Sequence, residues 1–194
     1  MSQERTVRIP PQAPPRWSEA TRAVFGAVEP VPAAGDGPTG RPLHLPAVVA
    51  HHERLLGPYM AWATAVARGG VLAPRDSALL ALRTALRCGS EFEWGVHAAS
   101  ALGRAGLTDD DVGRVARGPD AAWSVRDAAL IRAADELHDT QVISDATWDT
   151  LVGSFATDAL LEIVFVVGHY TMLAMVANSA GVQPEAAWPR LPPL

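Results

Sequence analysis

The sequence contains only one cysteine, Cys88, among its 194 residues. A single thiol cannot form a disulfide within the chain, and it cannot complete a redox cycle that needs two thiols in one subunit. The N-terminal segment up to Trp17 lacks the apolar run of a secretion signal, and four prolines interrupt it. We therefore expect a cytoplasmic protein.

The chain also lacks an excess of positive charge. Sixteen basic residues stand against 21 acidic ones, which gives a net charge of -5 and a pI near 5.6. Binding to a phosphate backbone or an anionic membrane surface usually needs the opposite balance. We expect neither nucleic acid nor membrane as a partner, and the 48% hydrophobic content is typical of a folded globular domain.

No segment alternates apolar and polar residues as a half-buried strand requires. From residue 46 onward, residues that favour the first turn of a helix recur at regular intervals. They are Pro74, Ser90, Thr108, Ser124, Ser144 and Thr157. The pattern predicts an all-α fold, a bundle of about seven to eight helices.

The distribution of proline and glycine divides the chain into three parts. We expect an N-terminal arm and Pro/Gly-rich linker over 1–45, a helical domain over 46–182, and a Pro-rich tail over 183–194. One short helix is expected in the arm, from Ser18 to Val28. The first helix of the domain should run from Pro46 to Arg68 and be kinked or split at Gly57-Pro58.

The last predicted helix, from Thr157 to Ala180, is apolar nearly all round, which indicates a buried central helix. Glu162 and His169 would be costly in lipid, which argues against a membrane span. Eight short helices rarely enclose one helix completely. We therefore expect another copy of the chain to cover part of it, in a homo-oligomer such as a dimer, trimer or hexamer.

The densest group of polar residues lies between Cys88 and His97. At about 100° per residue, Ser90, Glu93 and His97 share one helix face near a positively polarised N-terminus. These groups could bind an anion and transfer protons. A purely structural interpretation stays open, in which Ser90 and Glu93 form a capping box and Glu93 pairs with His97.

This segment resembles the carboxymuconolactone decarboxylase and alkylhydroperoxidase D-like proteins. One branch of that family carries Cys-x-x-Cys-x-x-x-His here, and a decarboxylase-like branch carries Cys-Glu-Tyr-Glu-Trp-x-x-His. The run from Ser90 to His97, Ser-Glu-Phe-Glu-Trp-Gly-Val-His, is similar to the second form. Further similarities lie in Leu79–Arg83, Ala105–Thr108, Trp123–Asp127, Asp135–Leu137 and Leu173–Asn178. The resemblance implies an alkylhydroperoxidase D-like helical bundle over about residues 46–182.

The redox cysteine pair of the family is missing, since Ser90 and Glu93 occupy both positions. Thiol peroxidase activity is therefore not expected. The resemblance instead implies a cofactor-independent lyase of the decarboxylase-like type, which acts on a small organic acid or lactone. Glu93 and His97 would share the acid-base work while Ser90 hydrogen-bonds the substrate. An isomerase, dehydratase or cyclase, or a non-catalytic ligand-binding relative, stays an alternative.

Four further residues are candidates for substrate binding, each with a structural alternative. They are Trp94, Arg83, His169 and Tyr59. The two aromatic residues could equally be packing residues, Arg83 could neutralise a buried carboxylate, and His169 could pair with Glu162. A metal site formed by His51, His52 or His169 together with Glu93 and His97 is an alternative, but we expect neither a metal nor a cofactor.

Overall fold

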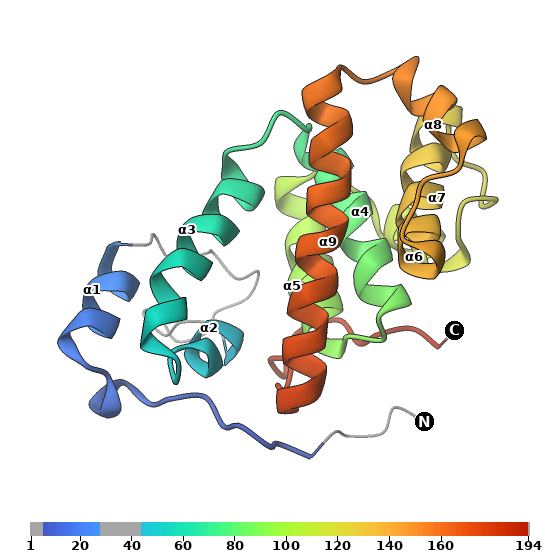
Figure 1. The fold of residues 1–194 in the computed structure, drawn as a ribbon. Helices are drawn as coiled ribbons and strands as arrows, with labels where there is room; N and C mark the ends of the chain where they lie inside the picture. The colour runs from blue at the N-terminus through green and yellow to red at the C-terminus, as the bar shows by residue number, and fades with distance from the viewer. Residues whose placement is uncertain (1–5, 28–43, 194) are drawn as a thin grey trace.

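The computed structural model describes residues 6–27 and 44–193 (Figure 1). Within these residues there is no strand, and the prediction of an all-α fold is confirmed. Besides a short 3-10 helix at Pro14–Arg16, the described chain forms nine α-helices. They are α1 Glu19–Ala27, α2 His44–Val49, α3 Glu53–Arg68, α4 Pro74–Arg87, α5 Glu91–Arg104, α6 Asp109–Arg117, α7 Val125–Thr140, α8 Asp145–Val152 and α9 Thr157–Ala180. The linker expected before residue 44 lies outside the described residues.

The predicted helix starts agree with the structure because they depend on local hydrogen bonds. At α5, α6, α7 and α8, the side chain of the capping residue accepts the N–H of the residue three positions later. The capping residues are Ser90, Thr108, Ser124 and Ser144. The reciprocal bond of a complete capping box is present at Thr108, where the Asp111 carboxylate accepts the backbone N–H.

The predicted break at Gly57-Pro58 was wrong. Pro58 lies inside α3, and the chain breaks earlier, between Val49 and Glu53. The backbone N–H groups of His51 and His52 donate to the carbonyls of Val48 and Val49, three residues earlier in each case. These bonds tighten the end of α2. Pro58 removes one backbone N–H donor from α3 but does not end the helix, which runs on to Arg68.

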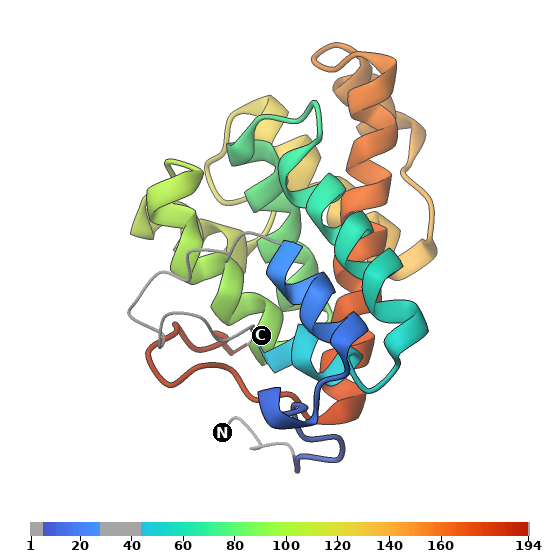
Figure 2. The same ribbon diagram turned by 90° about the vertical axis from the view of Figure 1, so that its left-hand side faces the viewer.

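Helices α4, α5 and α9 form the centre of the molecule, and the remaining helices flank them on two sides (Figure 1). α1, α2 and α3 lie on one side, and α6, α7 and α8 lie on the other. Figure 2 shows α1 lying across the outer surface of α3. The arrangement leaves α3 as the outer wall of the space beside α4, α5 and α9.

Helices α4 and α7 run parallel and in register. Several arginine–aspartate pairs join them, and in three of these pairs the partners are 52 residues apart in the sequence. The pairs are Arg75–Asp127 at 3.0 Å, Arg83–Asp135 at 2.6 Å and Arg87–Asp139 at 2.5 Å. The constant separation means that each pair supports the same relative position of the two helices.

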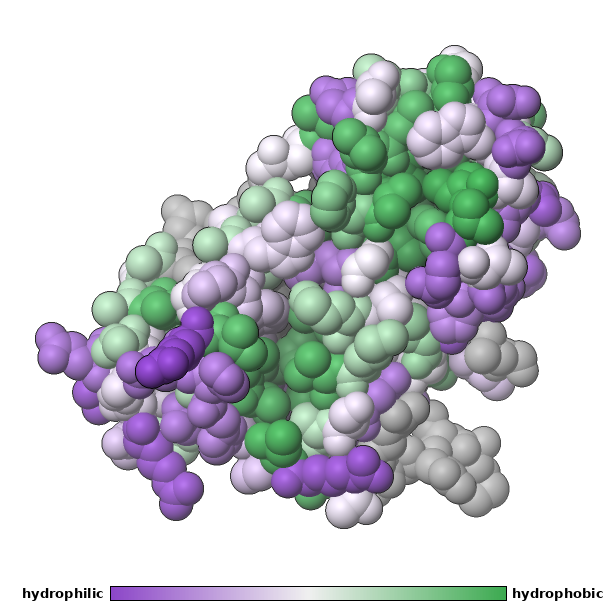
Figure 3. All heavy atoms as spheres, in the orientation of Figure 1, coloured by the Kyte–Doolittle hydropathy of each residue, from purple (hydrophilic) through white to green (hydrophobic). Residues whose placement is uncertain are grey.

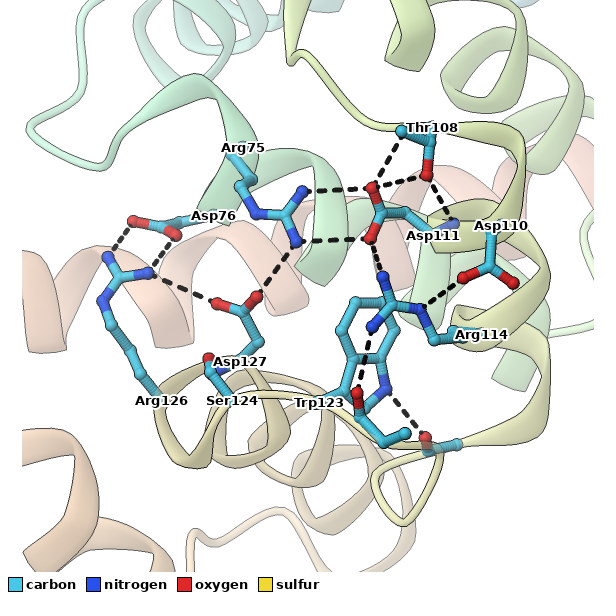
Figure 4. A network of polar contacts seen from close by, with 12 residues as sticks. Arg75, Asp76, Thr108, Asp110, Asp111, Arg114, Trp123, Ser124, Arg126 and Asp127 are labelled. Carbon is cyan, nitrogen blue, oxygen red and sulfur yellow. Dashed lines mark hydrogen bonds and ion pairs between the residues drawn. The ribbon is translucent and has the colours of Figure 1, made fainter.

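A crossed pair completes this contact at the helix starts (Figure 4). Arg126 of α7 binds Asp76 of α4, while Arg75 of α4 binds Asp127 of α7. Asp111 of α6 joins the same network, since it accepts hydrogen bonds from Thr108 and Arg75. Burial alone would raise the pKa of Asp111, but these hydrogen bonds lower it to about 2. Three helix starts are thus held together by one polar network.

The N-terminal arm packs against the end of the last helix. The backbone N–H groups of Arg8 and Ile9 both donate to the carbonyl of Ala180, at 2.8 and 3.0 Å. Gly181 ends α9 at a φ of 70°, and a Cβ there would collide with the carbonyl of Thr6. Glycine is therefore required at this position for two reasons, its backbone conformation and the close passage of the arm.

α9 is long and apolar enough to cross a membrane by length and composition, yet half of its most apolar window is buried in the protein. The prediction of a central apolar helix is confirmed on that buried face. The other face carries exposed side chains in a row with helical spacing, namely Leu161, Val164, Phe165, Met172 and Met175. In Figure 3, hydrophobic residues gather at the centre and top of the face on which α9 lies.

The Arg83–Asp135 pair gives a stability prediction. Arg83 is 7% exposed, and both of its outer nitrogens and Nε are hydrogen-bonded. Asp135→Ala leaves the guanidinium buried without its counter-ion, and we expect the free energy of unfolding to fall by about 3–5 kcal/mol in urea denaturation. Asp120→Ala removes the exposed partner of Arg132 and should change little. Equal effects of the two variants would contradict this interpretation.

Candidate functional site

A cavity of about 590 Å³ lies between α3 on one side and α4, α5 and α9 on the other. This volume lies within the ordinary range of small-molecule sites. Alanine, valine, leucine, methionine and phenylalanine side chains make up most of the described lining. The polar members of the lining are Tyr59, Thr64, Ser77, Glu93, His97, Ser100, Glu162, His169 and Tyr170.

Glu93 and His97 lie one turn apart on α5, and both line the cavity. Glu93 Oε2 is 3.6 Å from His97 Nε2. Glu93 is only 2% exposed, and its Oε1 is buried with no hydrogen-bond partner among the described residues. A buried carboxylate oxygen normally has a partner, so this oxygen is available to accept a proton or a hydrogen bond from a bound molecule.

Two tyrosines, the buried Tyr170 and the partly buried Tyr59, lie near the Glu93 carboxyl group. Burial, and then the charge of Glu93, raises the pKa of Tyr59 and of Tyr170 far above the ordinary value. Both phenols therefore keep their protons and can act only as neutral donors or acceptors. The ring of Tyr170 meets the ring of His97 edge-on at 4.4 Å between centroids, which fixes the orientation of the imidazole.

His169 reaches the cavity from α9 and is held by Trp62 of α3. The indole N–H of Trp62 donates to His169 Nδ1 at 3.0 Å. Burial, assisted by the nearby His97, lowers the pKa of His169 to about 4, so that the ring is neutral near pH 7. Because Nδ1 accepts a hydrogen bond, the ring proton lies on Nε2 and can be donated to a ligand.

Ser90 lies in a different environment from the one expected for a substrate contact. It is fully buried at the N-cap of α5, where its Oγ accepts the backbone N–H of Glu93 at 3.4 Å. It does not belong to the described lining of the cavity. The structure thus brings together Glu93 and His97, whereas Ser90 holds the start of the helix that carries them.

Arg83 and Trp94, two residues expected to bind substrate, lie outside the cavity lining. α4 turns Arg83 away from the cavity, and its nitrogens donate to Asp135 of α7 and to the carbonyl of Val115 of α6. Trp94 is 3% exposed and packs in the hydrophobic core. The other two candidates, Tyr59 and His169, do line the cavity.

The other two candidate metal ligands, His51 and His52, do not belong to the described lining of the cavity. His51 Nε2 is 2.9 Å from the carbonyl of Pro10, and His52 is exposed beside it. Among the residues that the structure describes, no group of three or more His, Cys, Asp and Glu side chains could hold a metal ion. Glu162, considered as a partner of His169, instead accepts the N–H groups of Val71 and Leu72 at 2.6 and 3.3 Å.

Cys88 is also separate from the cavity lining. Its Sγ lies 3.7 Å from His138 Nδ1 and 4.0 Å from Thr171 Oγ1. Burial raises the pKa of this thiol, which disfavours the thiolate form that nucleophilic chemistry requires.

Sequence reasoning missed Tyr170 and Phe92 as residues of the site, and it did not connect Trp62 with His169. Tyr170 directly follows His169, and two polar residues in a nearly uniform apolar helix are a signal that could have identified both. No sequence signal connects Trp62 to His169, since they are far apart in the chain. Phe92 lies within the recognised motif, but its position between two glutamates does not show which way it points.

Comparisons with known proteins give a match to a family model and matches to solved structures. A model of the carboxymuconolactone decarboxylase family matches residues 54–136, a segment that runs from α3 into α7 and includes Glu93 and His97. A search of curated proteins finds no match.

Several solved structures share the fold. The debrominase Bmp8 in complex with 2,3,4-tribromopyrrole has a TM-score of 0.75 and 12% sequence identity, and 95% of each chain is covered. An uncharacterized peroxidase-related protein from Silicibacter sp. TM1040 has a TM-score of 0.75 and 16% identity, with 96% of this chain and 95% of that chain covered. A peroxidase-related protein from Ralstonia eutropha JMP134 with an alkylhydroperoxidase AhpD core has a TM-score of 0.60 and 16% identity, with 72% and 75% covered. At these identities the likeness shows the fold alone.

The environment of His169 predicts a pH dependence of stability. The unfolded chain binds a proton at the ordinary pKa of 6.5, whereas the folded chain binds it at about 4. Between these values the unfolded state holds more protons, so the free energy of unfolding falls as the pH falls from 6.5 to 4, by roughly 3 kcal/mol in total.

The comparison variant is His169→Asn, whose Oδ1 can still accept the Trp62 N–H but does not titrate. In urea denaturation at several pH values, the wild type should lose stability relative to this variant across that window. His52→Asn, at an exposed histidine, should behave as the wild type does. A constant difference between wild type and His169→Asn would contradict the proposed burial of a neutral ring.

Proposed function

Because the chain belongs to the carboxymuconolactone decarboxylase and AhpD-like family, we propose that it is an enzyme in which Glu93 and His97 transfer protons to and from a small molecule, without a cofactor. The observation that carries the proposal is the buried, unpartnered Oε1 of Glu93 in a carboxylate that lines a cavity beside an imidazole. In a purely structural pair, both carboxylate oxygens normally have hydrogen-bond partners.

The proposed reaction is that of a decarboxylase-like lyase acting on a small organic acid or lactone. In such a step, the bond to the departing carbon breaks and its electron pair forms an enolate. His97 or Glu93 then delivers a proton to carbon, while Tyr59, Tyr170 or Nε2–H of His169 can donate hydrogen bonds to the enolate oxygen. The same groups would serve an isomerisation, dehydration or cyclisation.

Thiol peroxidase chemistry has little support in this chain. The sequence has one cysteine, and that residue does not belong to the described lining of the cavity. A role as a non-catalytic ligand-binding relative also has less support, since both proton-carrying side chains, Glu93 and His97, line the cavity. We further propose a cytoplasmic location, in line with the lone unpaired thiol.

Two substitutions test the assignment of Glu93 and His97. Glu93→Gln keeps the size of the side chain but removes its basicity, and His97→Ala removes the imidazole. Each should lower kcat by about 10²–10⁴-fold because general acid-base catalysis contributes roughly that much. To obtain a substrate, metabolites of cells lacking the gene are compared with cells restored by wild type or by Glu93→Gln, and the accumulating compound is assayed with purified protein.

The control is Cys88→Ser, which should retain full activity, and thiol-blocking reagents should leave the activity of the wild type unchanged. Circular dichroism and thermal unfolding should show that all variants are folded. If both Glu93→Gln and His97→Ala keep wild-type turnover, or if Cys88→Ser loses it, the proton-transfer mechanism is wrong.

We also propose that the exposed apolar face of α9 is covered by a second copy of the chain. Leu161, Val164, Phe165, Met172 and Met175 are 40–63% exposed, and this uncharged row extends over about 20 Å of the helix. The largest apolar patches of monomeric proteins reach a few hundred Å² and often mark interaction sites. An uncharged helical row of this kind can pack against its own copy across a two-fold axis without bringing like charges together.

The test is Phe165→Glu, which places a charge in the middle of the row and should convert the assembly to monomers in sedimentation equilibrium. Val142→Glu, at an equally exposed valine outside the row, should leave the assembly unchanged. A monomeric wild type, or cosedimentation of the wild type with phosphatidylcholine vesicles, would contradict coverage by a second copy.

A further inference from the structure

The C-terminal tail packs against the first turns of α5. Trp188, in the tail, is 5% exposed, and its ring meets the ring of Phe92 edge-on at 5.6 Å between centroids. The backbone N–H of Leu191 donates to Oε2 of Glu91 at 3.3 Å. An aromatic contact and a hydrogen bond therefore join the end of the chain to the start of this helix.

The indole of Trp188 also lies directly against the backbone of α5, at Gly95. A Cβ at Gly95 would lie 3.0 Å from Cε3 of Trp188, 3.2 Å from its Cβ and 3.6 Å from Cβ of Pro184. Any side chain at this position would therefore press against the indole. Glycine is unfavourable inside a helix, and here it leaves the space that the tail occupies.

The tail supports α5 from the side opposite the proton-transfer pair, Glu93 and His97. Gly95 is two residues from each member of the pair, which places it about 160° from both around the helix axis. Phe92 lies between the two faces, because it lines the cavity and also contacts Trp188. The contact with the tail therefore reaches the cavity wall through Phe92.

The same tail holds α2, which borders the cavity at Leu45 and Pro46. His44 is the first residue of α2, and its Nδ1 lies 2.9 Å from the carbonyl of Gln183. Its Nε2 lies 3.3 Å from Oε1 of Glu185. The tail thus connects two parts of the cavity wall, α2 and α5, that are far apart in the sequence.

From these contacts we infer that Trp188 is a positioning residue for the proton-transfer pair. It does not belong to the described lining of the cavity, and it acts through Phe92 and Gly95 by fixing where the first turns of α5 lie. The inference rests on the proposed function and adds to it a residue of the tail. A displacement of about 1 Å in a reacting group can lower a rate about 10²-fold, so a support behind the pair affects turnover.

The ring signal of His97 tests this inference in the full-length protein without substrate. The sequence has six histidines, and protein labelled with carbon-13 at the histidine ring Cε1 allows the His97 signal to be identified by its loss in His97→Ala. Trp188→Ala should move this signal by more than its linewidth, and Trp188→Phe, which keeps an aromatic ring, should return it toward the wild-type position. If thermal unfolding shows that Trp188→Ala is not folded, Trp188→Leu takes its place with the same expectation.

The matched control is Trp123→Ala, the same substitution at a partly buried tryptophan outside the described cavity lining. Its Nε1 donates to the carbonyl of Gly118, between α6 and α7. Trp123→Ala should leave the His97 signal in place. Once a substrate is known, Trp188→Ala should lower kcat by about tenfold or more with a smaller change in KM, whereas Trp123→Ala should change neither. An unmoved His97 signal in Trp188→Ala, or equal effects of the two variants, would overturn the inference.

A double-mutant cycle attributes the effect to the contact itself. Gly95→Ala fills the space of the indole, but it also adds a methyl group two residues from His97. The movement of the His97 signal that Gly95→Ala causes should therefore be smaller in the background of Trp188→Ala, where the indole is absent. Equal movement in both backgrounds would contradict a positioning role of the indole at Gly95.

These readouts separate the inference from the proposed function. If Glu93→Gln retains full activity but Trp188→Ala moves the His97 signal, then the proton-transfer mechanism fails and the placement of His97 by Trp188 stands. If Glu93→Gln loses activity but Trp188→Ala changes neither the signal nor kcat, then the mechanism stands and the positioning role is wrong.

Discussion

The arrangement of the molecule depends on α4, whose two faces have different partners. One face carries Arg75, Arg83 and Arg87, and aspartates of α7 bind all three in a constant register. Because these ion pairs are partly or wholly withdrawn from water, they fix one relative position of the helices rather than supplying much net stability. The face toward the cavity carries Pro74, Ser77, Ala78 and Ala81. These small side chains leave space for a ligand, while the three arginines are bound on the side of α7.

Within that space, the chemistry is determined by what surrounds one carboxylate. Glu93 has an imidazole on the next turn and two tyrosines that stay protonated, but no described cationic side chain shares the cavity lining with it. An imidazole and protonated phenols around a carboxylate are suited to proton transfer. His169 contributes a neutral N–H because Trp62 fixes its tautomer from across the cavity. The site is therefore assembled from α3, α5 and α9, although its central pair comes from α5 alone.

The sequence was informative where the physical cause was local. Helix starts follow from a side chain and the backbone N–H three residues later, and the shared face of Glu93 and His97 follows from the helical repeat. Sequence reasoning failed where the cause was a distant partner. Arg83 could have faced substrate or a buried aspartate, and only the register of α4 with α7 shows that Asp135 binds it. The bond between Trp62 and His169 likewise depends on how α3 packs against α9. The break before α3 was misplaced because a proline weakens a helix without specifying where it ends.

The contact between the arm and α9 has a consequence for the order of folding. Arg8 and Ile9 are synthesised long before their hydrogen-bond acceptor, the carbonyl of Ala180. The arm must therefore stay undocked while the helices between them are made. Its attachment can occur only after the central helix is complete, and a docked arm is a sign that α9 has formed.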